Sequence, residues 1–120
     1  MQTILAVDDS ASMRLMLSHT LRSAGYQVVQ ACDGVDALEK APQQAIDLVI
    51  TDQNMPRMDG LSLTAALRSQ PQWARLPVLI LTTESDPGVK DSARAVGATG
   101  WMAKPFDPAR LVGVIRQVLR

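Results

Sequence analysis

The chain has 120 residues with 12 basic and 12 acidic side chains, so its formal net charge is zero, and it has one cysteine. This length suits one domain with an ordinary hydrophobic core. A neutral chain lacks the basic surface of proteins that bind nucleic acid or anionic membranes, and no apolar run approaches the ~20 residues of a membrane span. A lone cysteine cannot form an intramolecular disulfide, which favours a reducing compartment. We therefore expect one cytoplasmic domain over residues 1–120, with no effector domain and no nucleic acid or membrane partner.

Short apolar runs alternate with helical patterns along the whole chain. They are rich in Val, Ile and Leu, mostly lack polar alternation, and fall at residues 3–7, 27–31, 48–51, 78–82 and 100–103. This composition is typical of parallel strands that are covered on both faces by helices. Five strand–helix units in strict alternation predict an α/β fold, a doubly wound (βα)5 domain with a five-stranded parallel sheet.

The helices between these strands have predictable ends. Gly25 ends the first helix and Gly97 ends the fourth. Asp33 can cap the second, and the third spans residues 61–69. The fourth and fifth helices each begin with an N-cap aspartate followed by proline at the first helical position, at Asp86-Pro87 and Asp107-Pro108.

Four further side chains are not assigned a chemical role. Met13 and Met16 fall on the apolar stripe of the first helix and should pack in the core. His19, the only histidine, falls off that stripe and should be solvated, so it is not expected to be a phosphorylation site or a ligand. Cys32 should end the second strand as a small buried residue rather than a redox centre.

Reactive side chains follow the carboxyl ends of four predicted strands. Ligands of open parallel sheets bind at this edge, next to the topological switch point. The carboxylates, hydroxyls and ammonium that should converge there are Asp8, Asp9, Asp52, Thr82, Thr83 and Lys104. Two carboxylates ~4 Å apart repel each other by about 4 kcal/mol at an effective dielectric constant of about 20. Three of them can stay ionised together only beside a cation.

This set of side chains favours Mg²⁺, because that ion prefers hard oxygen ligands and completes its shell with water and phosphate oxygens. A carboxylate is also a competent phosphoryl acceptor. The metal and Lys104 would neutralise charge on a transferring phosphoryl group, and the Thr82 hydroxyl would donate a hydrogen bond to it. The residues thus predict metal-assisted phosphorylation of an aspartate. The alternative for the first acidic pair is a plain loop start, with Asp9 capping the first helix.

Four motifs occur in order at the predicted strand ends: VDDSASMR, TDQNMPRMDG, LTTE and GWMAKPF. Over the whole chain they resemble the response-regulator receiver domain, most closely the single-domain chemotaxis regulators of the CheY type. The resemblance implies a flavodoxin-like fold with strand order 2-1-3-4-5. It also implies a monomeric regulatory domain, not an enzyme, that catalyses only its own phosphorylation and dephosphorylation. The implied partners are a histidine kinase as phosphodonor and a downstream protein, the flagellar motor switch or another.

The resemblance also implies a metal site. The cofactor would be Mg²⁺ (or Mn²⁺), and Asp52 would be the phosphoacceptor. Asp9 and Asp52 would ligate the metal directly, together with the backbone carbonyl of Asn54. Asp8 would act mostly through water.

Further roles implied by the resemblance concern the switch. Lys104 would pair with the phosphoryl oxygens, and its bond to Pro105 would be cis. Thr82 would be the switch hydroxyl, which moves toward the phosphoryl group. Trp101 stands where receivers usually carry a Tyr or Phe whose rotamer reports phosphorylation. Residues expected to tune dephosphorylation or access to Asp52 are Asn54, Thr83 and Glu84.

Other functions are less well supported by the residues. A small phosphatase of the haloacid-dehalogenase kind would carry an acid two residues after its nucleophile, where this chain has Asn54. A flavodoxin-like mononucleotide binder would need a Gly-rich or Ser/Thr-rich phosphate loop after the first strand. A receiver that acts by protein contact alone would not need the complete acid–hydroxyl–lysine set. Because the fourth helix, DPGVKDSARAVG, departs from the chemotaxis type, a phosphorelay or another signalling pathway stays open beside chemotaxis.

Overall fold

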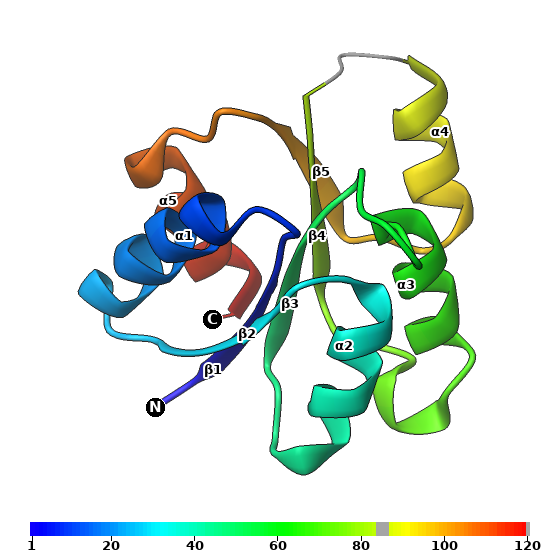
Figure 1. Ribbon diagram of the computed structural model, residues 1–120, viewed down its shortest axis with the longest axis horizontal. Helices are drawn as coiled ribbons and strands as arrows, with labels where there is room; N and C mark the ends of the chain where they lie inside the picture. Colours follow the sequence, from blue (N-terminus) through cyan, green and yellow to red (C-terminus); the bar gives the residue numbers. More distant parts are fainter. Residues whose placement is uncertain (84–86, 120) are drawn as a thin grey trace.

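The computed structural model describes residues 1–83 and 87–119. One sheet of five parallel strands has the order β2-β1-β3-β4-β5 (Figure 1). The predicted fold class and strand order are confirmed. The predicted strand bounds are also correct, except that the third strand includes Asp52 as its last residue. The strands are β1 (Thr3–Val7), β2 (Gln27–Ala31), β3 (Leu48–Asp52), β4 (Val78–Thr82) and β5 (Gly100–Ala103).

Helices cover both faces of the sheet, with α1 and α5 on one face and α2, α3 and α4 on the other (Figure 1). Two short 3-10 turns, η1 and η2, follow α2 and α3. The order along the chain places each helix between two strands, as the alternation of patterns predicts. The bounds are α1 (Ala11–Ser23), α2 (Gly34–Lys40), η1 (Ala41–Gln43), α3 (Gly60–Arg68), η2 (Pro71–Trp73), α4 (Pro87–Ala95) and α5 (Pro108–Leu119).

Side-chain oxygens cap four of the described helices; at α5 the predicted cap Asp107 accepts the N–H of Ala109 (3.1 Å). Ser10 caps α1, Asp33 caps α2 and Asp59 caps α3, each by accepting a backbone N–H three residues further on. The cap of α1 is therefore Ser10 and not Asp9, which leaves the Asp9 carboxylate for another role. Asp86, the predicted cap of α4, lies outside the described residues.

Alternate strand residues build two apolar cores. Leu5 and Val7 of β1 belong to the core that packs under α2, α3 and α4. Ile4 and Ala6 belong to the core that packs under α1 and α5. Because both faces are buried, each fully buried Val, Leu or Ile side chain contributes roughly 1.5–3 kcal/mol, and the strand ends project from a rigid base. In the described part of the chain, no helix has the length and apolar content needed to cross a lipid bilayer.

Two burial predictions are wrong. Met16 is 56% exposed, whereas Ser18 is 2% exposed, because α1 packs against α5 as well as the sheet and its buried stripe runs through Leu17, Ser18 and Leu21. His19 is exposed, as predicted. Cys32 is exposed rather than buried, because β2 ends one residue earlier and Cys32 already belongs to the connection to α2.

Candidate functional site

The carboxyl ends of β1 and β3 bring three acidic side chains together. Carboxylate oxygens of Asp8, Asp9 and Asp52 lie within 4.8 Å of one another. Asp8 and Asp52 are 1% and 5% exposed, whereas Asp9 faces solvent. Oxygen ligands that are partly buried and reached by solvent from one side suit a hard divalent cation such as Mg²⁺.

Local hydrogen bonds fix Asp8 where β1 ends. Its backbone N–H donates to the carbonyl of Ala31 (3.1 Å), and its Oδ1 accepts the N–H of Ser10 (2.9 Å). The Arg14 guanidinium, one turn into α1, donates to the Asp8 carbonyl oxygen (2.6 Å). The tight entry into α1 therefore holds this carboxylate toward the other two acids.

Lys104 contacts two of the three carboxylates from the far edge of the sheet. Its Nζ lies 3.3 Å from Asp8 Oδ2 and 3.2 Å from Asp52 Oδ1, and its side chain is 12% exposed. Its backbone N–H donates to the carbonyl of Thr82 (2.8 Å). The bond from Lys104 to Pro105 is cis, as the resemblance implies. The structure thus brings the predicted lysine, which follows β5, to the predicted acids at the ends of β3 and β1.

The charges at this edge do not balance. Burial raises the pKa of Asp52 and the charge of Asp8 raises it further, whereas the Lys104 ammonium opposes both effects without cancelling them. Burial acts to lower the pKa of Lys104, but the carboxylates of Asp52 and Asp8 outweigh it and raise that pKa. One ammonium beside three carboxylates leaves excess negative charge, which a divalent cation would offset.

The connection from β3 to α3 passes close to the backbone of Asp52. The N–H of Gly60 donates to the carbonyl of Gln53 (3.1 Å), and a Cβ at Gly60 would lie 2.6 Å from the carbonyl oxygen of Asp52. Only glycine allows the backbone to approach this closely. The path of the loop that carries the exposed Asn54 is therefore fixed at its α3 end.

The remaining predicted site residues on β4 differ in exposure. Thr82 ends the strand and is 3% exposed, whereas Thr83 directly after it is exposed. Glu84 lies outside the described residues. Thr82 is thus buried at the end of β4, the strand next to the one that carries Asp52.

Trp101 on β5 is half-buried against the core under α2, α3 and α4. Two cations of α4 lie over its ring: the Arg94 guanidinium carbon is 5.4 Å from the ring centroid and the Lys90 Nζ is 6.0 Å from it. Cation–π contacts of this kind stabilise by about 0.5–1 kcal/mol where they are exposed. They attach the side chain of Trp101 to α4 rather than to the acidic cluster.

One ion pair at this edge is not predicted from the sequence. Arg57 donates two hydrogen bonds to the carboxylate of Asp33, from Nε at 2.7 Å and from Nη2 at 3.0 Å. Asp33 is foreseen only as a helix cap. The two residues lie 24 positions apart, and Arg57 has φ +62°, a conformation that nothing in its residue type indicates.

Comparison with known proteins agrees with this geometry. Residues 4–116 match the response regulator receiver domain family. The chemotaxis protein CheY4 of Vibrio cholerae is 50% identical, with a TM-score of 0.95 over 99% of both chains. Chemotaxis protein CheY1 of Helicobacter pylori is 37% identical over 97% of this chain and 95% of its own length.

A third relative is the receiver domain of the sensor histidine kinase PA1611 of Pseudomonas aeruginosa, whose crystal structure has a magnesium ion coordinated in the active site cleft. It is 31% identical, with a TM-score of 0.90 over 98% of this chain and 97% of that one. Other matched proteins are described as transcriptional regulators, and the chain spans only 48% of their length. From the match over nearly all its residues and the acids and lysine at its strand ends, the chain belongs to the response regulator receiver domains of two-component systems.

Proposed function

We propose that this chain is a phosphorylation switch in which Asp52 accepts a phosphoryl group from a histidine kinase in the presence of Mg²⁺. The observation that carries the proposal is the contact of the Lys104 ammonium with both Asp8 and Asp52. Phosphorylation would add negative charge at Asp52. The Lys104 ammonium and a divalent cation held by the acids would stabilise that charge.

The acidic cluster fits a divalent metal by its chemistry, since it offers three carboxylates within 4.8 Å of one another and carries excess negative charge. Mg²⁺ or Mn²⁺ would be held directly by Asp9, Asp52 and the backbone carbonyl of Asn54, with Asp8 acting through water. When bound, the ion would offset the charge of the carboxylates and of the phosphoryl oxygens. The magnesium ion in the related PA1611 receiver domain supports this choice.

In the transfer itself, a carboxylate oxygen of Asp52 forms a bond to phosphorus while the P–N bond to the kinase histidine breaks. The electron pair of that bond returns to the imidazole nitrogen. Lys104, 3.2 Å from Asp52 Oδ1, would contact the phosphoryl oxygens, and the Thr82 hydroxyl would donate a hydrogen bond to them. Hydrolysis of the acyl phosphate by water would reset the switch, at a rate tuned by Asn54, Thr83 and Glu84.

The output surface we infer is the face of α4, β5 and α5. Thr82 and Trp101 belong to neighbouring strands that are paired in register, with Thr82 opposite Ala103. A movement of the Thr82 side chain would therefore reach β5 and, through Trp101, α4. The similarity to chemotaxis proteins favours a partner in chemotaxis, such as the flagellar motor switch. A phosphorelay or another signalling pathway is the alternative.

The experiment that tests the proposed function is modification by acetyl phosphate, a small phosphodonor, with and without Mg²⁺. We expect the mass of the intact protein to rise by one phosphoryl group only with the metal, and Asp52→Asn to take up none. Asp91→Asn, which alters an exposed aspartate of α4, is the matched control and should be modified normally. Normal phosphorylation of Asp52→Asn would refute the assignment. Pull-downs with and without beryllofluoride would then capture the output partner.

A further inference from the structure

The loop between β3 and α3, residues 53–59, is fastened to α2 by an ion pair. The Arg57 guanidinium presents two parallel N–H groups to the Asp33 carboxylate, at 2.7 and 3.0 Å. The Asp33 carboxylate is buried, with its side chain 6% exposed, whereas the Arg57 side chain is 57% exposed. Paired hydrogen bonds between charged groups fix orientation as well as distance, so the contact defines where the loop lies.

The loop reaches this contact through an unfavourable backbone conformation. Arg57 has φ +62° and is the sole non-glycine residue with a positive φ among residues 1–83 and 87–119. The N–H of Met58 donates to the carbonyl of Pro56 (2.7 Å), which closes a three-residue turn around Arg57. A side chain in this region costs about 1–2 kcal/mol, so interactions elsewhere must hold the turn in place.

A second contact fastens the same turn to the start of α2. The N–H of Gly34 donates to the carbonyl of Met58 (3.2 Å). A Cβ at Gly34 would lie 2.5 Å from the Met58 side chain, so the loop packs directly on the first helical residue. Asp33 therefore serves two elements at once, because it also caps α2 by accepting the N–H of Asp36 (2.8 Å).

The other end of the loop is held independently. The Gln53 amide donates to Asp59 (3.2 Å) and accepts the N–H of Leu61 (2.9 Å). Asn54 therefore lies between two fixed points, one at Gln53 and the other at Arg57. Loss of the fastening at Arg57 would free the stretch that includes Asn54 without disturbing Gln53 or Asp52.

We infer that Arg57 and Asp33 form a positioning pair for the metal site: they hold the path of the loop, and thereby place the Asn54 carbonyl for Mg²⁺. The inference rests on the proposed function, because it assumes that the metal binds beside Asn54. Neither residue is among the ligands proposed for the metal, which are Asp9, Asp52 and the Asn54 carbonyl. Their effect is therefore on Mg²⁺ affinity and not on the chemistry of Asp52.

The test is the Kd for Mg²⁺, measured by titration calorimetry on the unphosphorylated chain and on Arg57→Gly, Asp33→Asn and the double variant. Glycine adopts φ +62° without strain, and asparagine keeps a cap oxygen for α2, so both variants should stay folded. We expect each to raise the Kd about tenfold, as loss of groups that orient metal ligands does. The double variant should be no weaker than either single one.

Lys40→Gln is the matched control, because it removes another ion pair of α2, Lys40 with Asp36 at 3.1 Å, and should leave the Kd unchanged. The rate of acetyl phosphate modification at saturating Mg²⁺ should be normal in Arg57→Gly. An unchanged Kd in that variant, or additive effects in the double variant, would overturn the positioning role while the proposed function stands. Absence of Mg²⁺ binding to the unaltered chain would overturn both.

Discussion

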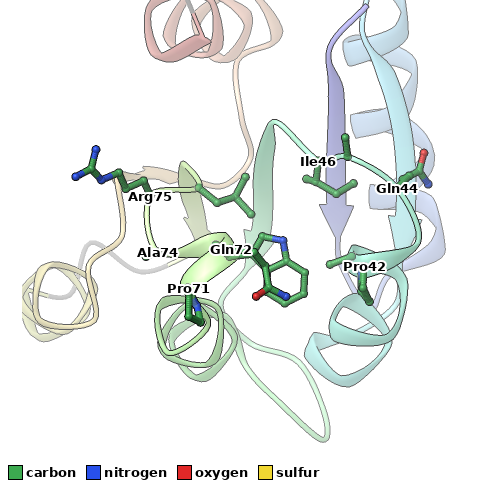
Figure 2. Close-up of a pocket in the computed structure, with 11 residues that line it drawn as sticks. Pro42, Gln44, Ile46, Pro71, Gln72, Ala74 and Arg75 are labelled. Atoms are coloured by element: carbon green, nitrogen blue, oxygen red, sulfur yellow. The ribbon is translucent and has the colours of Figure 1, made fainter.

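The two ends of the sheet differ in what their polar groups do. At the carboxyl end, Asp8, Asp52 and Lys104 face one another in a charged, mostly buried cluster. At the amino end, the chain leaves a hollow of about 680 Å³ between η1 and η2. It is lined mainly by apolar and amide side chains, and Figure 2 shows several of them: Pro42, Gln44, Ile46, Pro71 and Gln72.

The polar groups at the amino end close the strands instead of facing a ligand. Thr3 and Asp47 join β1 to the segment before β3, since the Thr3 N–H donates to Asp47 Oδ2 (2.7 Å) and the Asp47 N–H donates to the Thr3 carbonyl (2.8 Å). The Val78 N–H donates to Thr99 Oγ1 (3.0 Å). We therefore propose that the charged cluster at the carboxyl end, and not the hollow, is the reacting site. Four variants test what the side chains at the two ends do.

The largest effect is expected for Lys104→Met, which removes the ammonium at the carboxyl end. The rate of acetyl phosphate modification at saturating Mg²⁺ should fall about 100-fold or more, as it does when one donor to a developing charge is lost. Mg²⁺ should still bind, because all three carboxylates remain. Lys40→Met is the control. A normal rate for Lys104→Met would show that the cluster is not the reacting site.

Trp73→Ala alters the amino end instead. Trp73 lines the hollow and packs against the core under α2, α3 and α4. We expect its loss to lower the free energy of unfolding by about 2 kcal/mol, less than for a fully buried tryptophan, in urea denaturation. The phosphorylation rate of the folded protein should stay unchanged. A loss of rate comparable to that of Lys104→Met would show that the two ends are coupled.

Asp52→Asn should stabilise the metal-free fold. A carboxyl whose pKa is raised in the folded state favours folding while protonated, and this contribution is lost as the pH rises above 3.8 through the raised pKa. At pH 7 the ionised Asp52 therefore opposes folding, and its replacement should raise the melting temperature, by about 4 °C for each 1 kcal/mol gained in a domain of this size. Mg²⁺ should raise the melting temperature of the unaltered chain more than that of Asp52→Asn. A lower melting temperature for the variant would contradict the charge imbalance.

The sequence predicts the strands and the residues at the carboxyl end of the sheet, because both follow from the local pattern of apolar residues. Apolar runs define the strands, and the residue that ends each run falls at the same edge, so Asp52 and Lys104 are placed correctly without knowledge of any distance. Side-chain burial near element ends is harder. Cys32 lies one residue beyond the end of β2 and is exposed. The buried stripe of α1 runs through Leu17, Ser18 and Leu21 and leaves Met16 exposed.

The Asp33–Arg57 pair could not be predicted for a different reason. It joins residues 24 positions apart, and it depends on a left-handed backbone at Arg57 that residue type does not favour. Only the assembled contacts of Gly34, Met58 and Asp33 make that conformation the stable one. The ion pair forms only when the loop of residues 53–59 packs on α2, so neither segment predicts it by itself.

The pH dependence of the stability of Asp33→Asn distinguishes Asp33 from Asp52, two carboxyl groups with shifted pKa values at the carboxyl end of the sheet. The hydrogen bonds from Arg57, then the N–H of Asp36, hold the pKa of Asp33 below its ordinary value of 3.8. Its contribution to folding is therefore complete above 3.8 and lost as the pH falls through the lowered pKa, opposite in sign to that of Asp52. Urea midpoints measured from neutral to acid pH should show the unaltered chain more stable than Asp33→Asn at pH 7, with the difference shrinking only below 3.8. A difference that stays constant with pH would mean that the pKa of Asp33 is not lowered in the folded protein, which would contradict its ion pair with Arg57.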